Sequence, residues 1–402
     1  MRLLCVGNRY PPWSAGGYEV IFSAAVRAFR AAGHPTRVLT TGPDPSDLVV
    51  GPSPESDVHR DLRWYWRDHR FPDLSVREAL ALEQENRRTL RRHLQDFSPH
   101  AVVWWAMGGM SLSLIEQVRR LGVPAVGVVG DEWFVYGPEV DGWSRRWRGI
   151  GRAAAPAVQR LTGVPTRLRL DRTARWVFIS THLQRLAAER GWRTQDSAVA
   201  HPGVDGSHFA PAVPKPWRWR LLYCGRVDPR KGILTAIQAL AQLPPEARLT
   251  IDGPGEEGLR RELMAGATEA GVQERISFCR SASEQVPAAY ADADAVIFPV
   301  TWREPWGLVP LEAMSVGRPV VASRAGGGPA EYLREEGNCL QFPAGDPRAL
   351  AESVQRLAGD PGLRERLVRE GRRTAQQLSQ QAFHRALELE LLKLPAGTAT
   401  DA

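Results

Sequence analysis

Short apolar runs alternate with helical patterns along the whole chain, and this alternation limits the possible folds most strongly. The apolar runs cover residues 3–7, 36–41, 101–106, 125–130, 176–180, 197–200, 221–225, 249–253, 276–279, 295–299, 319–323 and 339–342. They lack regular alternation of polar and apolar residues, as strands buried on both faces of a parallel sheet do. Between the first two runs, Phe22, Val26 and Phe29 follow helical spacing and Gly33 stands at a C-terminal cap. The pattern predicts an α/β protein with doubly wound, Rossmann-like units.

A proline-rich stretch separates the two series of strands. Residues 209–219 contain Pro211, Pro214 and Pro216, a composition typical of a stiff connector. A chain of 402 residues is also too long for one ordinary core. We predict a first domain over residues 1–208, a linker over 209–219, a second domain over 220–375 and a C-terminal helix over 376–395 that returns to the first domain.

Composition excludes several classes of protein. No stretch approaches the ~20 apolar residues of a membrane-spanning helix, and the opening run is too short for a signal peptide. The four cysteines, Cys5, Cys224, Cys279 and Cys339, have no Cys-x-x-Cys spacing, which argues against a zinc site or a disulfide framework. We therefore expect a cytoplasmic protein without a bound metal or other cofactor.

The positive charge of the chain is concentrated in one segment. The net charge is +7, yet residues 145–175 hold nine arginines against the single acid Asp171, so the rest of the chain is close to neutral. A general nucleic-acid-binding protein would spread its charge more widely, so we expect no nucleic-acid partner. Pro156 and Pro165 interrupt the segment, which favours a solvated or ligand-facing region over a membrane-bound amphipathic helix, although peripheral membrane contact stays open.

One glycine motif follows the opening strand of each half, at the end of the strand where doubly wound sheets bind their ligands. Gly16 and Gly17 open a helix after the first strand, and backbone N–H groups at such a turn can approach an anion. In the second half, Gly225 and Arg226 are followed by Lys231, and two cations at one turn can hold a diphosphate from both sides.

The strongest motif follows the strand that ends at Pro299. Glu304 stands in the loop and Glu312 stands eight residues later, inside the helix that is expected to begin near Gly307. Glu312 is flanked by apolar residues, which is unusual for a merely solvated acid. Its carboxylate could accept hydrogen bonds from sugar hydroxyls, and the helix start could meet phosphate oxygens. A second glycine loop, Gly326-Gly327-Gly328, with Glu331 after it, follows the next strand.

Together these motifs resemble the retaining glycosyltransferases of family 4, which have the GT-B architecture of two Rossmann-like domains facing across a cleft. The resemblance covers essentially the whole chain, and the Glu-x7-Glu element is its most specific part. It implies that the first domain binds the acceptor and that the second domain binds a nucleotide-sugar donor, with a UDP-sugar favoured over a GDP-sugar.

The resemblance also implies roles for individual residues. Arg226 and Lys231 would neutralise the diphosphate, Glu312 would hold the ribose and Glu304 would contact the donor sugar. The remaining donor-site residues would be Gly16, Gly17, Gly225, Arg280, Trp306, Gly307 and Leu308. Asp131 or Glu132 stands where many relatives have a histidine, so Asp131 is grouped with the catalytic residues. The expected acceptor site comprises Asp131, Glu132, Trp133, Trp105 and His182, since indoles stack on sugar rings.

The expected function is therefore sugar transfer with retention of configuration, without a metal, to a hydroxyl of a sugar-containing or aromatic small molecule. Two alternatives stay open. One is a glycosyltransferase that acts at a membrane surface on a lipid-linked acceptor. The other is a non-catalytic protein of the same architecture that binds a nucleotide sugar or a glycan.

Overall fold

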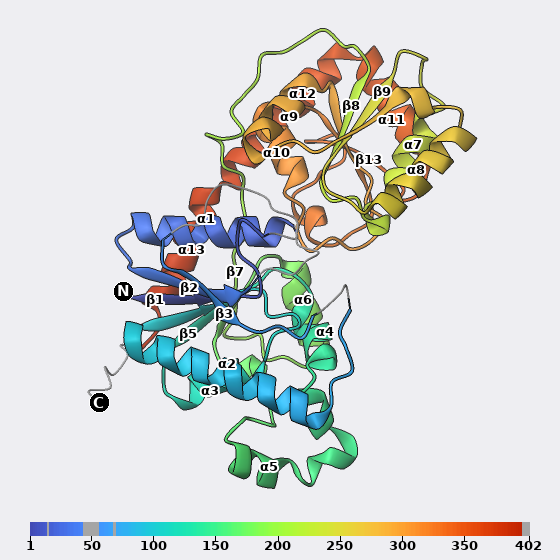
Figure 1. Ribbon diagram of the computed structural model, residues 1–402. Helices are drawn as coiled ribbons and strands as arrows, with labels where there is room; N and C mark the ends of the chain where they lie inside the picture. The colour runs from blue at the N-terminus through green and yellow to red at the C-terminus, as the bar shows by residue number, and fades with distance from the viewer. Residues whose placement is uncertain (14–15, 43–55, 67–69, 396–402) are drawn as a thin grey trace. The chain divides into compact units, whose positions relative to one another are not determined.

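The computed structural model describes residues 1–13, 16–42, 56–66 and 70–395 of the chain. These residues form two compact units: Met1–Ala200 with the chain from His384 onward, and His201–Phe383. Each unit contains one parallel sheet with helices on both of its faces (Figure 1). The predicted α/β class with two doubly wound units is confirmed.

The described part of the first unit contains a seven-stranded sheet in the order β3-β2-β1-β4-β5-β6-β7. Its strands are β1 (Leu3–Val6), β2 (Thr36–Thr41), β3 (Val58–Leu62), β4 (Ala101–Trp104), β5 (Ala125–Val129), β6 (Arg175–Phe178) and β7 (Ala198–Val199). Leu3 of β1 lies opposite Thr36 of β2 and Ala101 of β4, so the strand order reverses beside β1. Ligands of doubly wound sheets bind beyond the carboxyl ends of the strands at such a reversal.

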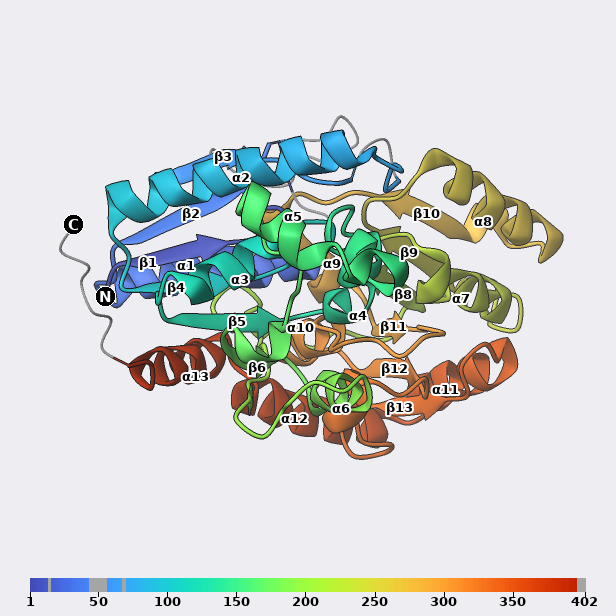
Figure 2. The same cartoon turned by 90° about the horizontal axis from the view of Figure 1, so that it is seen from below.

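Helices cover both faces of this sheet (Figure 1). They are α1 (Gly17–Ala31), α2 (Val76–Phe97), α3 (Ser113–Arg120), α4 (Trp133–Val140), α5 (Ala155–Thr162) and α6 (Thr181–Glu189), with 3-10 turns at Ser144–Trp147, Gly149–Arg152 and Leu170–Arg172. Helix α2 is the longest, begins at a Ser75–Glu78 capping box and packs against β3 (Figure 2).

The second unit contains a six-stranded sheet in the order β10-β9-β8-β11-β12-β13. Its strands are β8 (Arg220–Cys224), β9 (Arg248–Asp252), β10 (Ile276–Cys279), β11 (Ala295–Phe298), β12 (Val320–Ser323) and β13 (Leu340–Phe342). Its helices are α7 (Ile233–Leu240), α8 (Glu257–Glu269), α9 (Val286–Asp292), α10 (Val309–Val316), α11 (Pro347–Gly359) and α12 (Pro361–Gln377), with 3-10 turns at Pro229–Lys231, Gln273–Arg275, Ser283–Gln285 and Gly328–Glu331.

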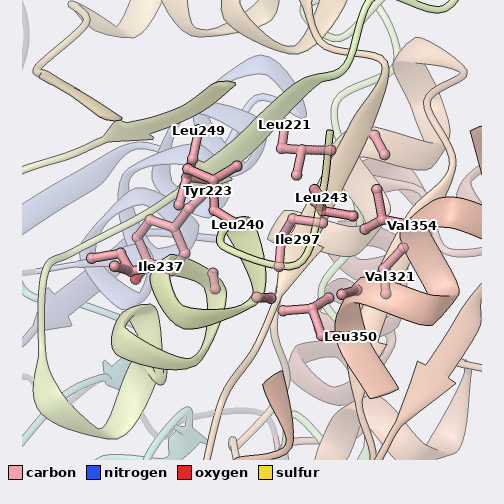
Figure 3. Packing of buried hydrophobic residues seen from close by; sticks show 14 of the residues in the cluster. Leu221, Tyr223, Ile237, Leu240, Leu243, Leu249, Ile297, Val321, Leu350 and Val354 are labelled. Carbon is pink, nitrogen blue, oxygen red and sulfur yellow. The ribbon is translucent and has the colours of Figure 1, made fainter. Parts of the chain in front are cut away.

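The core of the second unit lies between its sheet and the layer formed by α7, α8 and α11 (Figure 3). Leu240 of α7, Ile297 of β11 and Val354 of α11 point into it and are almost fully buried. Burial of one such side chain contributes roughly 1.5–3 kcal/mol, so this layer holds the sheet rigidly beneath the loops at its carboxyl edge.

The proline-rich segment differs from the expected free linker. The boundary between the units falls at Ala200 and His201, and residues 209–219 belong to the second unit. The buried Phe209 accepts a hydrogen bond from the Ser315 hydroxyl through its carbonyl, and the Ala212 N–H donates to the carbonyl of Val316. The segment is therefore attached to α10, because these contacts satisfy backbone groups that a free linker would expose to water.

The last helix, α13 (Gln380–Leu392), begins in the second unit, and its residues from His384 onward belong to the first. Within the first unit, Glu390 pairs with Arg175 at the start of β6, and Glu388 lies 3.4 Å from Nε2 of His34. No helix in the part of the chain that the structure describes is long and apolar enough to cross a membrane.

Candidate functional site

The loops after β8 and β11 meet at the carboxyl edge of the second sheet through one ion pair. Nζ of Lys231 lies 2.6 Å from Oε2 of Glu304, and the two side chains are only 18% and 13% exposed. The pair joins residues 73 positions apart in the sequence. Because a lysine ammonium carries three donor hydrogens, Lys231 can keep this bond and still bind a phosphate oxygen.

Trp302, which the sequence motifs did not single out, holds the pair in place. Its indole N–H donates to the same Glu304 oxygen at 2.7 Å, and its ring lies 5.7 Å from the Lys231 ammonium. The guanidinium of Arg230 lies over the same ring at 4.3 Å. Cation–π contact and the hydrogen bond fix Glu304 and Lys231 relative to one another. A tryptophan two residues before the motif glutamate was the available signal in the sequence.

The turn that carries Lys231 is braced at both ends. Asp228 caps it by accepting the Arg230 N–H, and hydrogen bonding to Arg230 lowers the pKa of Asp228 to about 2. The exposed Arg226 lies 3.4 Å from the same carboxylate. At the other end, Gly232 has φ +67°, and a Cβ there would lie 2.0 Å from the carbonyl oxygen of Pro299. Glycine at this position lets the two loops approach each other.

The second glycine loop packs its backbone directly against the Glu304 segment. Gly327 has φ +81°, a Cβ on it would lie 2.3 Å from the Glu304 carbonyl oxygen, and the Gly328 N–H donates to that oxygen at 2.8 Å. The glycines therefore serve the close approach of two loop backbones, and they place Glu331 beside the same edge. This packing explains the repeated glycines more directly than a phosphate contact does.

Glu312 lies in the first turn of α10, which begins at Val309 with Leu308 at its N-cap. The Tyr290 hydroxyl donates to Oε2 of Glu312 at 2.6 Å. Burial raises the pKa of Glu312 to about 6, with the Tyr290 bond opposing the rise. When Glu312 is ionised, its partly buried carboxylate needs hydrogen-bond donors in addition to Tyr290. The hydroxyl groups of a ligand can supply them.

His201 and Trp306 form a second support for the loop before α10. Their rings stack at 4.5 Å, Nε2 of His201 lies 3.0 Å from Oε2 of Glu331, and the Trp306 indole donates to the Pro202 carbonyl at 2.7 Å. Trp306 is buried, so its indole packs within the protein and only its backbone can meet a ligand. The sequence reasoning missed the contribution of His201.

Comparison with known proteins gives a family match for the second unit and the fold of the whole chain. The model of glycosyl transferases group 1 matches residues 209–374, which is most of the second unit. The second unit thus carries a match to the glycosyl transferases group 1 model. The fold is GT-B: sucrose-phosphate synthase from Thermosynechococcus elongatus superposes with a TM-score of 0.72 at 21% identity over 98% of this chain and 99% of that one. Anabaena HepE, solved with UDP and glucose, gives 0.68 at 18% identity over 98% and 100%.

The curated relatives match this chain over only part of their own length. D-inositol 3-phosphate glycosyltransferase from Salinispora tropica is 33% identical over 207 residues, which are 45% of this chain and 42% of that protein. The lipopolysaccharide core biosynthesis glycosyltransferase LpsE from Rhizobium meliloti is 30% identical over 225 residues, 54% of this chain and 64% of that protein. The chain thus spans about half the length of the curated relatives it matches.

In the first unit, the Gly16 turn and Asp131 lie at the same sheet edge. The Gly16 N–H donates to the Glu19 carboxylate at 2.9 Å, so a side chain already satisfies this group. Asp131 follows β5 and accepts hydrogen bonds from the Trp133 N–H and the Tyr136 hydroxyl. Burial raises the pKa of Asp131 to about 6, with Glu19 and Glu132 adding to the rise. The Asp131 carboxyl could therefore exchange a proton near neutral pH.

Two of the expected acceptor contacts are wrong. Trp105 and Trp133 are both fully buried: Trp105 stacks on Phe22 at 4.7 Å, and Trp133 packs against Trp176 at 5.8 Å. An indole enclosed on every side has no face to offer a sugar. The sequence pattern could not distinguish the two uses, because packing and ligand stacking favour the same residue type.

The remaining expected residues lie at separate places. His182 stands in the first turn of α6, after the N-cap Ser180, and Arg280 is exposed directly after β10. In the arginine-rich segment, Arg145 pairs with Asp73, and Arg146 donates to the carbonyls of Gly142 and Leu74. Among the described residues of this segment, the one α-helix is α5, which is eight residues long. The segment is thus partly neutralised and contains no long amphipathic helix among its described residues.

A cavity of about 500 Å³ lies in the first unit, away from the expected ligand edge. It adjoins the amino ends of β5, β6 and β7 and is bordered by Arg119, Arg172 and Arg175. These arginines pair with Glu116, Asp171 and Glu390, respectively. Because their charges are matched and the cavity faces the amino ends of the strands, we do not assign the donor to it.

Proposed function

We propose that the protein transfers a sugar from a nucleoside diphosphate sugar to a hydroxyl of an acceptor. The observation that carries this proposal is the Lys231–Glu304 pair, held by Trp302 at the carboxyl edge of the second sheet. The pair places a partly buried cation next to a partly buried carboxylate. A diphosphate needs the cation and a sugar hydroxyl needs the carboxylate, so one donor molecule matches both.

The donor is bound in three places under this proposal. Lys231 and the exposed Arg226 contact the diphosphate, Glu312 accepts hydrogen bonds from the ribose hydroxyls, and Glu304 accepts one from the transferred sugar. The start of α10 adds backbone N–H groups, because Leu308 at its N-cap has no side-chain acceptor for them. A UDP-sugar is the favoured donor, and HepE, which shares the fold, was crystallised with UDP.

Transfer proceeds with retention of configuration and without a catalytic metal. When the bond between the anomeric carbon and the phosphate oxygen breaks, the electron pair and the negative charge go to the leaving diphosphate. Lys231 and Arg226 stabilise that charge, which is the task a metal has in other transferases. The leaving phosphate accepts the proton of the acceptor hydroxyl as the new glycosidic bond forms on the same face.

The acceptor is a sugar-containing or aromatic small molecule bound by the first unit. Trp64, Trp66 and Phe71 support this choice, since they follow β3 at the carboxyl edge and form a partly exposed aromatic cluster. Asp131 is the candidate for orienting the acceptor hydroxyl. Relatives that act on inositol phosphate or on lipopolysaccharide core indicate that hydroxyl-rich acceptors should be tested first.

A screen of nucleotide sugars by thermal shift, followed by product analysis, tests the proposal. We expect one UDP-sugar to raise the melting temperature and to be consumed faster with an acceptor than without it. A donor that binds but is never consumed would favour a non-catalytic binding protein. Sedimentation with anionic vesicles, lost when Arg145, Arg146 and Arg148 become Ser, would favour a lipid-linked acceptor instead.

A further inference from the structure

Two histidines and one aspartate come together in the first unit, outside every motif of the donor site. His59 and Asp61 stand two residues apart on β3, so their side chains leave the same face of the strand. His93 comes from α2, which packs against that face. Each residue offers one donor atom, and these three atoms lie within 4.8 Å of one another.

The state of His93 suits a metal ligand. The residue is only 3% exposed, and its Nε2 lies 3.1 Å from Oδ2 of Asp61. Its Nδ1 is buried without a hydrogen-bond partner among the described residues. A buried imidazole with one unsatisfied nitrogen is costly as a purely structural residue.

The neighbours of His59 and Asp61 fit the same interpretation. Asp57 contacts Nε2 of His59 at 2.8 Å, which leaves Nδ1 of His59 as its donor atom. A carboxylate on the far nitrogen of a histidine is the usual support for a metal-bound ring. Two cations also lie nearby: Arg37 pairs with Asp57, and Arg92 contacts Oδ2 of Asp61 at 2.8 Å. The Arg92 side chain is 58% exposed, so a metal can displace it into water.

We propose that His59, Asp61 and His93 bind a divalent transition-metal ion, with zinc as the preferred ion. Two imidazoles and one carboxylate suit zinc, nickel or cobalt, whereas magnesium and calcium require mostly oxygen ligands. Ligand atoms of a tetrahedral zinc ion lie ~3.3 Å apart, at bond lengths of about 2.0–2.2 Å. Small rotations of the three side chains bring donor atoms now within 4.8 Å to that separation. Water completes the coordination.

The metal would brace an edge strand that supports the first glycine turn. β3 lies at the edge of the sheet, where β2 is the one strand among the described residues that pairs with it. Arg60, between the two ligands, faces the opposite side of the strand and donates to the carbonyls of Tyr10 and Pro11 at 3.2 and 2.6 Å. Attachment of β3 to α2 by a metal therefore also stabilises the segment that precedes Gly16 and Gly17.

Zinc titration of the metal-stripped, full-length protein tests the site, with calorimetry as the readout. We expect one zinc ion per chain, and affinity reduced at least tenfold in His59→Gln and in Asp61→Asn. His208→Gln replaces an exposed histidine of the second unit and should leave zinc affinity unchanged. Lys231→Ala should also leave it unchanged, which separates this proposal from that of the donor site. Cobalt should give the intense visible absorption of a tetrahedral complex.

The proposal is overturned if the wild type takes up no zinc at millimolar concentration, or if both ligand variants keep wild-type affinity. Should a variant fail to fold by circular dichroism, nitrogen NMR of the wild-type histidine rings decides the matter. Shifts of the His59 and His93 ring nitrogens on addition of one equivalent of zinc support the site. Unchanged shifts overturn it.

Discussion

Replacement of Glu312 by glutamine should make the protein more stable and lower its affinity for the donor. The gain in stability should depend on pH. Glu312 is partly buried at the start of α10, and burial raises its pKa from 4.5 to about 6. Glutamine has nearly the same shape, and its carbonyl oxygen can still accept the hydrogen bond from the Tyr290 hydroxyl. The substitution thus removes the charge and keeps the main contact.

The magnitude follows from the pKa change. A rise from 4.5 to about 6 corresponds to about 2 kcal/mol, at 1.36 kcal/mol for each unit of pKa. The folded protein holds the proton more tightly than the unfolded chain does. The contribution to stability is therefore complete below pH 4.5 and is lost as the pH rises through 6. At pH 7.5 the wild type should be up to about 2 kcal/mol less stable than Glu312→Gln. At pH 4, where Glu312 is mostly protonated in both the folded and the unfolded state, this pH-dependent difference should nearly vanish.

Thermal or denaturant unfolding of both proteins between pH 4 and 7.5 measures this difference. For a unit of the size of His201–Phe383, about 2 kcal/mol corresponds to a shift in melting temperature of roughly 4–8 °C. Glu352→Gln is the matched control, because Glu352 is 58% exposed on α11 and should change stability little. A stability difference that does not vary with pH would refute the reasoning. Unchanged UDP affinity in Glu312→Gln would refute its role in donor binding.

Four further predictions concern the donor site. Lys231→Ala should weaken UDP binding about tenfold or more by calorimetry, whereas the exposed Lys215→Ala should not. Glu304→Gln should lower kcat more than it weakens donor binding, because its contact strengthens as the sugar reacts; equal kinetics would place the reacting sugar elsewhere. Gly327→Ala should destabilise the protein by several kcal/mol more than Gly326→Ala. Both glycines have positive φ, but a Cβ added at Gly327 would lie 2.3 Å from a backbone carbonyl oxygen, whereas one added at Gly326 would meet no backbone atom. Equal melting temperatures of the two variants would contradict this prediction. Proton NMR of the first product should show the donor's anomeric configuration, and magnesium should not accelerate chelator-treated protein; inversion or a magnesium requirement would contradict the proposed chemistry.

The amino-acid sequence determined the architecture and the location of the proposed donor site. Each apolar run between residues 221 and 342 corresponds to a strand of the second sheet, because strands buried on both faces must be apolar throughout. The motifs proposed to bind the donor directly follow these strands, so the parallel topology alone gathers Lys231, Glu304 and Glu312 at one edge. The first sheet followed the same rule except at β3. The sequence of that edge strand is Val-His-Arg-Asp-Leu, and a search for apolar runs does not detect a strand of such polar composition.

Only the tertiary structure decided which side chains meet and which are enclosed. The sequence could not show that Lys231 pairs with Glu304 or that Trp302 fixes both, since these contacts depend on how two distant loops pack. Nor could it show that Trp105 and Trp133 lie inside the core, because indoles serve packing and ligand binding equally well. The His59, Asp61 and His93 cluster combines a strand with a helix that starts more than a dozen residues later. Such groups have no spacing signature, because the distance between their side chains is set by packing and not by the chain.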